Sequence, residues 1–395
     1  MSQGSKWIVV EALAEAGITR WEPGHLHAIA PRAAQYIPRV SPADLGCVIP
    51  DLDLWDLWPV QLVDGAVALF DGWSLWMILS APVLPDPDLR HDVARIRLVS
   101  HKDGLWQDCG NLLPDGLNIG SREWAGSALY DPATQRLTLF YTASGYQGEE
   151  TRSFAQRLCQ SHAELTVAGG AARTSGWSPV EESVRADGID YMVVDQAEGV
   201  PGFIKGFRDP AHFRDPATDL DYLFFTGSLQ ASRSDWNGVI GVARSYGGHQ
   251  DWALLPPVFS ADGLCNELER PVMIFRDGCY YLFWSTQRKV FAPGGPSGPN
   301  GLYGAVGPSP IGPFELLNGT GLVAANPETA PFQTYSWWVT QDLTVHGFVD
   351  LTEVVGPEDI VDDPAWRRAH FGGVPAPVFR IVLDGACAFV AGSVV

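Results

Sequence analysis

Short runs of apolar residues, separated by turn-forming residues, recur along this chain from about residue 47 onwards. The runs are rich in Val, Ile, Leu, Phe, Tyr and Trp, and Gly, Pro, Asp or Asn lies between them. Runs of this kind predict β-strands, and hardly any stretch shows the period of a long amphipathic helix. We therefore predict strands over residues 67–70, 74–80, 95–99, 127–130, 137–142, 164–167, 222–226, 238–243, 272–275, 280–285, 302–306, 345–349, 378–383 and 386–390.

This pattern predicts an all-β fold and leaves sandwich, barrel and propeller open, because no repeat has a readable period. Before the strands, an Ala-rich stretch within residues 18–38 predicts one or two helices, and residues 7–16 predict a short helix or an arm. We expect an N-terminal arm with helices over residues 1–45 and one domain over residues 46–395, since no change in composition marks a further boundary.

Composition and charge narrow the class of protein. Hydrophobic residues make up 46% of the 395 residues and charged residues 18%, which favours a packed core over disorder. The formal net charge of −20 argues against nucleic acid and anionic membranes as partners. The N-terminus has no conventional signal peptide, so we expect a cytoplasmic location or export by a non-classical route.

Metal and cofactor motifs are weak in this sequence. His25 and His27 have no acidic or cysteine partner at ligand spacing, so an ordinary satisfied or exposed histidine is the better interpretation. The six cysteines show no CxxC spacing; their even number permits disulfides, but isolated buried thiols are the better interpretation. We therefore expect no metal and no cofactor. The cysteines are residues 47, 109, 159, 265, 279 and 387.

Acidic residues beside strand-like segments are the main candidates for chemistry. Glu267 and Glu269 are two apart, so on an extended segment they share a face, while Arg270 points to the other face. Asp56 and Asp209 lie in two distant segments of similar character. Carboxyl groups from distant segments that meet in one pocket are what glycosyl transfer requires. Spacing alone does not establish this, since most acidic pairs are solvated turn residues.

Five segments resemble, in the same order, the motifs of the levansucrase and inulosucrase family of glycoside hydrolases (family 68). The similarity extends over roughly residues 20–350, and the set is specific although no single motif is. The matching segments are Leu54-Trp55-Asp56-Leu57-Trp58-Pro59 (WDxWP), Glu123-Trp124-Ala125-Gly126-Ser127 (EWSGS), Phe207-Arg208-Asp209-Pro210 (RDP), Glu267-Leu268-Glu269-Arg270-Pro271 (the acid/base segment) and Thr334-Tyr335-Ser336 (TYS).

The resemblance implies a five-bladed β-propeller with a central funnel-shaped site, and a retaining enzyme that acts on sucrose and fructo-oligosaccharides. Asp56 would be the nucleophile, Glu269 the acid/base and Asp209 the transition-state stabiliser. The resemblance also implies substrate-binding side chains. Trp55 and Trp124 would wall the pocket, and Arg208 and Arg270 would orient carboxylates or sugars. Glu267 and Tyr335 would bind hydroxyls, and Gln287 lies near a position that helps to hold the acceptor.

Some assignments stay open at this stage. Asp53 is a fallback nucleophile, Glu267 a fallback acid/base, and Asp215 belongs to a second Phe-Arg-Asp-Pro segment that reads as a turn. A degenerate sugar-binding propeller and a propeller glycosidase acting on fructan- or arabinose-type glycans are the competing functions.

The sequence also departs from the family's pattern. Ala125 stands where the family usually has a Ser that hydrogen-bonds the nucleophile, Thr226 where a strand usually ends in Phe-Glu, and Gln287 near a usual Arg or His. Asn266 replaces an Asp that ligates calcium in Gram-positive relatives, which again predicts no metal.

Overall fold

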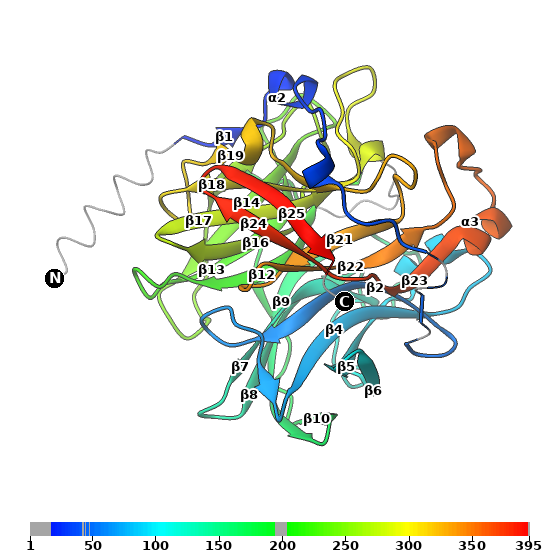
Figure 1. Cartoon of the computed structure of the whole chain (residues 1–395). Coiled ribbons are helices and arrows are strands. Elements are labelled where there is room, and N and C mark those ends of the chain that lie inside the picture. The colour runs from blue at the N-terminus through cyan, green and yellow to red at the C-terminus, as the bar shows by residue number, and fades with distance from the viewer. Residues whose placement is uncertain (1–16, 42, 44, 47, 194–203, 394–395) are drawn as a thin grey trace, which may run out of the picture.

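The computed structural model describes residues 17–193 and 204–393, apart from residues 42, 44 and 47. The predicted helix or arm at residues 7–16 and Cys47 lie outside these residues. The described chain is almost entirely β-strand, so the expected all-β class is confirmed (Figure 1).

The strands form antiparallel meanders that follow one another along the chain. The first contains β2 (Leu52–Gln61), β4 (Trp73–Pro82), β5 (Arg95–Lys102) and β6 (Leu105–Asn111), with β3 (Leu69–Phe70) on β4. The second contains β7 (Arg122–Asp131), β8 (Arg136–Ser144), β9 (Gln156–Ala168) and β10 (Ala171–Ser175), with β11 (Glu181–Val184) on β9. The third contains β12 (Phe207–Arg214), β13 (Asp221–Ser228), β14 (Gly238–Ser245) and β15 (Ala253–Ser260).

The C-terminal part of the chain continues this arrangement. A fourth meander contains β16 (Glu269–Arg276), β17 (Cys279–Thr286) and β18 (Gly301–Gly307), and both β19 (Glu315–Leu316) and β20 (Leu322–Ala325) pair with β18. A fifth contains β21 (Thr334–Val339), β22 (Thr344–Leu351), β24 (Phe379–Asp384) and β25 (Cys387–Ser393), with β23 (Phe371–Pro375) on β22.

The first strands of the meanders lie side by side in a ring. Contacts run from β2 to β7, β12, β16 and β21 and return to β2. Between β2 and β7 the contact becomes a short parallel pairing, with Val60 opposite Ala128 and Gln61 opposite Leu129. A ring of innermost strands with meanders radiating from it is the arrangement of a propeller. The number of blades stays a prediction, which this ring supports.

Helical segments are short and lie between the strands. They are α2 (Pro23–His27), η1 (Ala33–Gln35), η3 (Pro87–Asp92), η4 (Arg288–Val290), η5 (Leu317–Gly319), η6 (Pro357–Asp359) and α3 (Pro364–His370). The predicted N-terminal helices are therefore reduced to α2 and η1, because Pro31 cannot continue a helix through the Ala-rich stretch. No helix among the described residues is long and apolar enough to cross a membrane.

The N-terminal segment is fastened to the outer strands. β1 (Thr19–Arg20) adds to β15 in parallel, and Trp21 is buried, with its Nε1 donating to the Thr320 carbonyl at 3.0 Å. Gln35 donates to the Leu322 carbonyl at 2.7 Å. These contacts join the first described residues to the third and fourth meanders. The boundary at residue 45 stays a prediction.

The predicted strands all appear, but the structure has more. The additional strands include β6, β10, β12, β15, β21 and β23. The expectation of buried thiols is confirmed for Cys159 and Cys265 and wrong for Cys387, which is exposed on β25. Cys109 and Cys279 are partly buried.

Candidate active site

Each innermost strand leaves regular pairing at one point, and each of these points falls inside one of the five motifs. The registers shift between Trp55 and Leu57, Trp124 and Gly126, Arg208 and Ala211, Glu269 and Val272, and Tyr335 and Trp338. Four residues in these bulges have positive φ: Asp56 (38°), Asp209 (63°), Arg270 (51°) and Ser336 (59°). Left-handed backbone at residues other than glycine is strained, and such strain gathers at functional sites.

The three predicted catalytic carboxylates come together here. Asp209 Oδ2 accepts a hydrogen bond from the Arg270 backbone N–H at 3.4 Å. Asp56 accepts a hydrogen bond from the Ser336 side chain and lies in the field of both Arg270 and Glu269. Glu269 in turn accepts a hydrogen bond from the Tyr335 hydroxyl. Residues from β2, β12, β16 and β21 therefore share one electrostatic environment.

Arg208 holds three of the carboxylates. Its Nη2 lies 2.9 Å from Glu269 Oε1 and 3.5 Å from Glu267 Oε1, and its Nε lies 3.8 Å from Asp209 Oδ2. Arg208 is 6% exposed, so these charges interact in a setting that screens them weakly. One side chain thus sets the distances among the acidic groups.

Arg270 fastens the carboxylate cluster to the neighbouring innermost strands. Its guanidinium lies 5.7 Å from the Trp58 ring centroid and 5.5 Å from that of Trp338. Nη2 donates to the Leu57 carbonyl at 2.7 Å, and Nη1 donates to Ser336 Oγ at 2.9 Å. Arg270 therefore joins β16 to β2 and β21, and its position does not depend on the carboxylates alone.

Burial changes the acidity of the cluster. It raises the pKa of Asp209 to about 7 against the opposing charge of Arg208. Burial, with the nearby charge of Glu269, raises the pKa of Glu267 to about 7. Burial also raises the pKa of Asp56, although Arg270 and the Ser336 hydrogen bond lower it. Burial therefore makes Asp209 and Glu267 hold a proton closer to neutral pH than exposed carboxyl groups do.

The predicted wall and acceptor residues differ in their exposure. Trp55 is 1% exposed and lies beneath His91, with ring centroids 5.6 Å apart, so its ring is part of the core. Trp124 is partly exposed, and its Nε1 donates to the His91 carbonyl at 3.2 Å. Gln287 directly follows β17 and is partly exposed.

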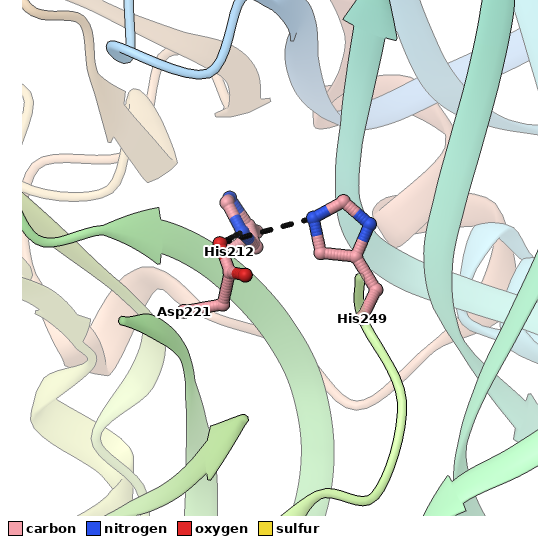
Figure 2. A group of neighbouring side chains, drawn as sticks. All are labelled: His212, Asp221 and His249. Carbon is pink, nitrogen blue, oxygen red and sulfur yellow. Dashed lines mark hydrogen bonds and ion pairs between the residues drawn. The ribbon is translucent and has the colours of Figure 1, made fainter. Parts of the chain in front are cut away.

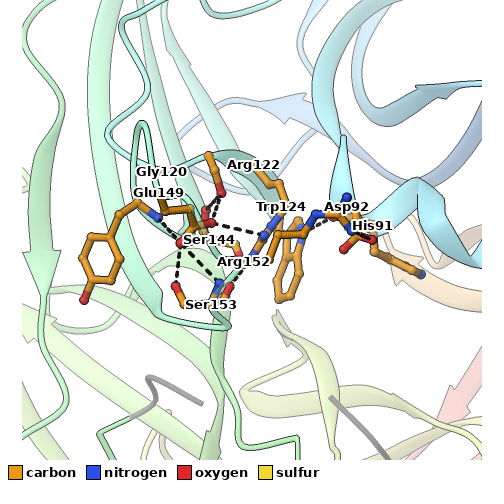
Figure 3. A network of polar contacts seen from close by, with 12 residues as sticks. His91, Asp92, Gly120, Arg122, Trp124, Ser144, Glu149, Arg152 and Ser153 are labelled. Carbon is orange, nitrogen blue, oxygen red and sulfur yellow. Dashed lines mark hydrogen bonds and ion pairs between the residues drawn. The ribbon is translucent and has the colours of Figure 1, made fainter. Parts of the chain in front are cut away.

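Figure 3 shows the network that holds Trp124. Glu149 accepts hydrogen bonds from Ser153 and lies 3.4 Å from Arg122 Nη1, and Arg152 forms an ion pair with Asp92. These contacts join the loop after β8 to the segment that carries His91 and Asp92.

The fold brings two further side chains to this site: Thr226, which the sequence marked only as a departure from the family's pattern, and Asp350. Thr226 Oγ1 lies 3.2 Å from Asp209 Oδ2 and 3.0 Å from the Leu268 carbonyl, so it contacts both the stabiliser candidate and the acid/base segment. Asp350 lies in the field of Arg90 and Lys289, and burial raises its pKa to about 6. No motif pointed to Asp350, which lies in β22, beside β21, and in the field of Asp56.

Asp53 and Asp215, the second candidates for nucleophile and stabiliser, have other partners. Asp53 forms an ion pair with Arg368, at 2.6 Å to Nη1 and 3.0 Å to Nη2. Asp215 accepts hydrogen bonds from the Ala217 backbone N–H and from the Thr218 and Tyr280 hydroxyls. Asp215 therefore closes a turn after β12, as its sequence suggested.

Comparison with known proteins gives a consistent result. The levansucrase/invertase family model matches residues 12–237 and 228–393. A levansucrase from Rahnella aquatilis is 30% identical over 88% of each chain. A levansucrase from Zymomonas mobilis is 31% identical over 85% of this chain and 82% of its own.

Solved structures agree. An inulosucrase from Halalkalicoccus jeotgali bound to kestose is 36% identical, covers 96% of both chains and superposes with a TM-score of 0.87. A levansucrase from Gluconacetobacter diazotrophicus, 23% identical, covers 96% of this chain and 91% of its own with a TM-score of 0.78 and shows the shared fold. The resemblance carried by the five motifs and the propeller architecture are confirmed.

The raised pKa of Asp209 gives a prediction for stability. Between the ordinary range of an aspartate and pH 7 the folded chain keeps a proton that the unfolded chain releases, so the Asp209 carboxyl lowers stability increasingly as pH rises and fully above about 7. Asp209→Asn is expected to raise the melting temperature, and by more at pH 8 than at pH 5.

Asp215→Asn is the matched control, because it changes the same motif in the second copy. It removes an acceptor from a buried turn and is expected to lower the free energy of unfolding by about 1–3 kcal/mol. Thermal unfolding of both variants at the two pH values measures this. A melting temperature for Asp209→Asn below that of the wild type at pH 8 would contradict the raised pKa of Asp209.

Proposed function

The chain belongs to the levansucrase/invertase family, and we propose that it is a retaining enzyme that transfers the fructosyl unit of sucrose to water or to another sugar. The observation that carries this proposal is the single cluster in which Arg208 and Arg270 hold Asp56, Asp209 and Glu269 inside the strand ring. The degenerate sugar-binding alternative is not favoured, because all three carboxylates are present.

In the first step, the Asp56 carboxylate attacks the anomeric carbon of the fructosyl unit. The bond from this carbon to the glucosyl oxygen breaks, and Glu269 gives its proton to that oxygen, so that glucose leaves and a fructosyl-enzyme ester remains. Tyr335 donates to Oε2 of Glu269 and Arg208 donates to its Oε1, which orients the carboxyl for this transfer.

In the second step, Glu269 takes a proton from water or from a sugar hydroxyl, and the oxygen attacks the same carbon. The ester bond breaks and Asp56 is released as a carboxylate. Positive charge develops on the fructosyl ring in both steps. Asp209, held by Arg270 and Thr226, is placed to accept hydrogen bonds from fructose hydroxyls as this charge grows.

The departures from the family pattern are partly compensated. Ala125 has no hydroxyl for the nucleophile, but Ser336 supplies a hydrogen bond to Asp56. Thr226 cannot act as a glutamate, but its hydroxyl contacts Asp209. These contacts support the chemistry at the fructosyl unit. On the acceptor side, we propose no side chain in place of the Arg or His that the family usually has near Gln287.

Asp56→Asn is expected to lower sucrose turnover by at least about a hundredfold while the fold is retained, because an amide does not act as the nucleophile. Asp53→Asn is the control, three positions away in β2. It is expected to keep turnover within about tenfold and to lower stability, since Arg368 loses a charged partner. Glucose release and thermal unfolding measure the two effects, and the reverse order of activity losses would reassign the nucleophile to Asp53.

Glu269→Gln is expected to slow sucrose by about 10²–10⁴-fold and to slow a fructoside with a phenol-type leaving group far less, because only sucrose needs a proton on departure. Glu267→Gln, which loses a contact to the same Arg208, is expected to affect both substrates alike. Initial rates on the two substrates decide between them. Equal losses for Glu269→Gln would transfer the acid/base role to Glu267.

The acceptor side gives a prediction about products. Because Gln287 holds an acceptor sugar less firmly than the usual Arg or His, we expect hydrolysis and short fructo-oligosaccharides, with little high-molecular-weight fructan. Gln287→Arg is expected to raise the share of fructose transferred to sugar. Free fructose, free glucose and product size at high sucrose test this, and abundant ethanol-precipitable fructan from the wild type would contradict it.

A further inference from the structure

A second cluster of polar side chains lies at the other end of β12, away from the carboxylates. Figure 2 shows His212, Asp221 and His249 pointing toward one another. His212 Nε2 lies 2.9 Å from Asp221 Oδ1, and His249 Nε2 lies 3.8 Å from the same oxygen. One ligand atom from each residue falls within 4.8 Å of the other two.

These residues come from three separate places in the third meander. His212 is near the end of β12, Asp221 begins β13, and His249 lies in the turn between β14 and β15. Within the described chain, this is the only group of three or more His, Cys, Asp or Glu side chains with ligand atoms this close. None of the three belongs to the five motifs.

The surroundings hold the two inner ligands in place. The side chains of Asp221 and His212 are 0% and 2% exposed. The Phe140 ring is stacked on His212 with centroids 5.6 Å apart and meets His249 edge-on at 5.5 Å. His249 is 22% exposed at its side chain, so an ion can reach the cluster from solvent on that side.

We propose that His212, Asp221 and His249 form a binding site for a divalent transition metal ion, with zinc as the best match. Two imidazole nitrogens and one carboxylate oxygen are a ligand set that zinc uses, and calcium and magnesium prefer oxygen ligands alone. This site does not include Asn266, the position at which the sequence lacks the calcium-ligating Asp of Gram-positive relatives.

The geometry needs a limited adjustment. Zinc–ligand bonds of about 2.0–2.1 Å put tetrahedral ligand atoms roughly 3.3 Å apart. His212 and Asp221 are already near this separation, and His249 moves inward from a turn that contains Gly247 and Gly248. With the ion bound, His212 would bind through Nε2 and keep its hydrogen on Nδ1.

Arg136 opposes a cation through its field at His249, and Arg214 opposes it at Asp221. Arg214 Nη1 lies 2.9 Å from Asp221 Oδ2, which leaves Oδ1 as the ligand oxygen. An outer hydrogen bond to the second oxygen of a ligating carboxylate is common in metal sites and orients the ligand. The ion would tie the end of β12 to β13 and to the β14–β15 turn, and it would brace the strand that carries Asp209.

The test uses the full chain freed of metal with a chelator and titrated with zinc chloride. Calorimetry is expected to show one zinc ion per chain, and the melting temperature is expected to rise with zinc. His249→Asn is the diagnostic variant, because asparagine also tolerates the left-handed backbone at this position (φ 56°). It is expected to weaken zinc binding by at least about tenfold, since even loss of an outer partner costs that much.

Asp219→Asn is the matched control. It removes a negative charge from the same hairpin, 3.8 Å from Arg214, without removing a ligand atom, and is expected to bind zinc as the wild type does. Sucrose turnover in the absence of zinc reports whether each variant is folded. Absence of stoichiometric zinc binding in the wild type, or equal affinity in the wild type and His249→Asn, would overturn the proposal.

Discussion

The bulges in the innermost strands are the constraint on which the site depends. A regular strand points alternate side chains to opposite faces, and a bulge locally changes that direction. Asp56, Asp209, Arg270 and Ser336 take left-handed backbone to achieve this, and each is fixed by contacts from other strands. The strain is local, while the contacts that maintain it extend around the ring.

The balance of buried charges is a second constraint on the active site. Asp56, Asp209, Glu267 and Glu269 share two guanidinium groups, those of Arg208 and Arg270, and burial raises the pKa of three of these carboxyls. Such a cluster costs stability, and the surrounding packing has to offset it. Arg270 shows how this is done: Trp58 and Trp338 flank it and two backbone carbonyls bind it, so it stays in place whichever carboxyl is protonated.

The sequence predicted the outer strands better than the strands that carry the site. β4 and β17 have long apolar runs, whereas β12 (Phe207–Arg214) is interrupted by charged residues and by Pro210. β21 (Thr334–Val339) was recognised only as a motif. In the sequence, Pro210 and Pro271 also argue against strands. In the structure, both prolines lie at bulges, where a strand tolerates them. The motifs gave Asp56, Asp209 and Glu269 as candidates through family resemblance. Ser336 and Thr226 as compensating partners, and His212 with His249 as neighbours, depend on register between strands, which no local pattern contains.

Thr226 shows how the two ends of the carboxylate cluster are coupled. Its hydroxyl has a single hydrogen and two acceptors in reach, Asp209 Oδ2 and the carbonyl of Leu268, the residue before Glu269. When Asp209 is ionised, the two acceptors compete for that hydrogen. When Asp209 carries its proton, it can donate to Thr226 Oγ1 and leave the hydroxyl hydrogen for Leu268. The protonation state of Asp209 thereby affects the backbone at Leu268, which positions Glu269. From the sequence alone, Thr226 indicated only that the family's usual glutamate is missing.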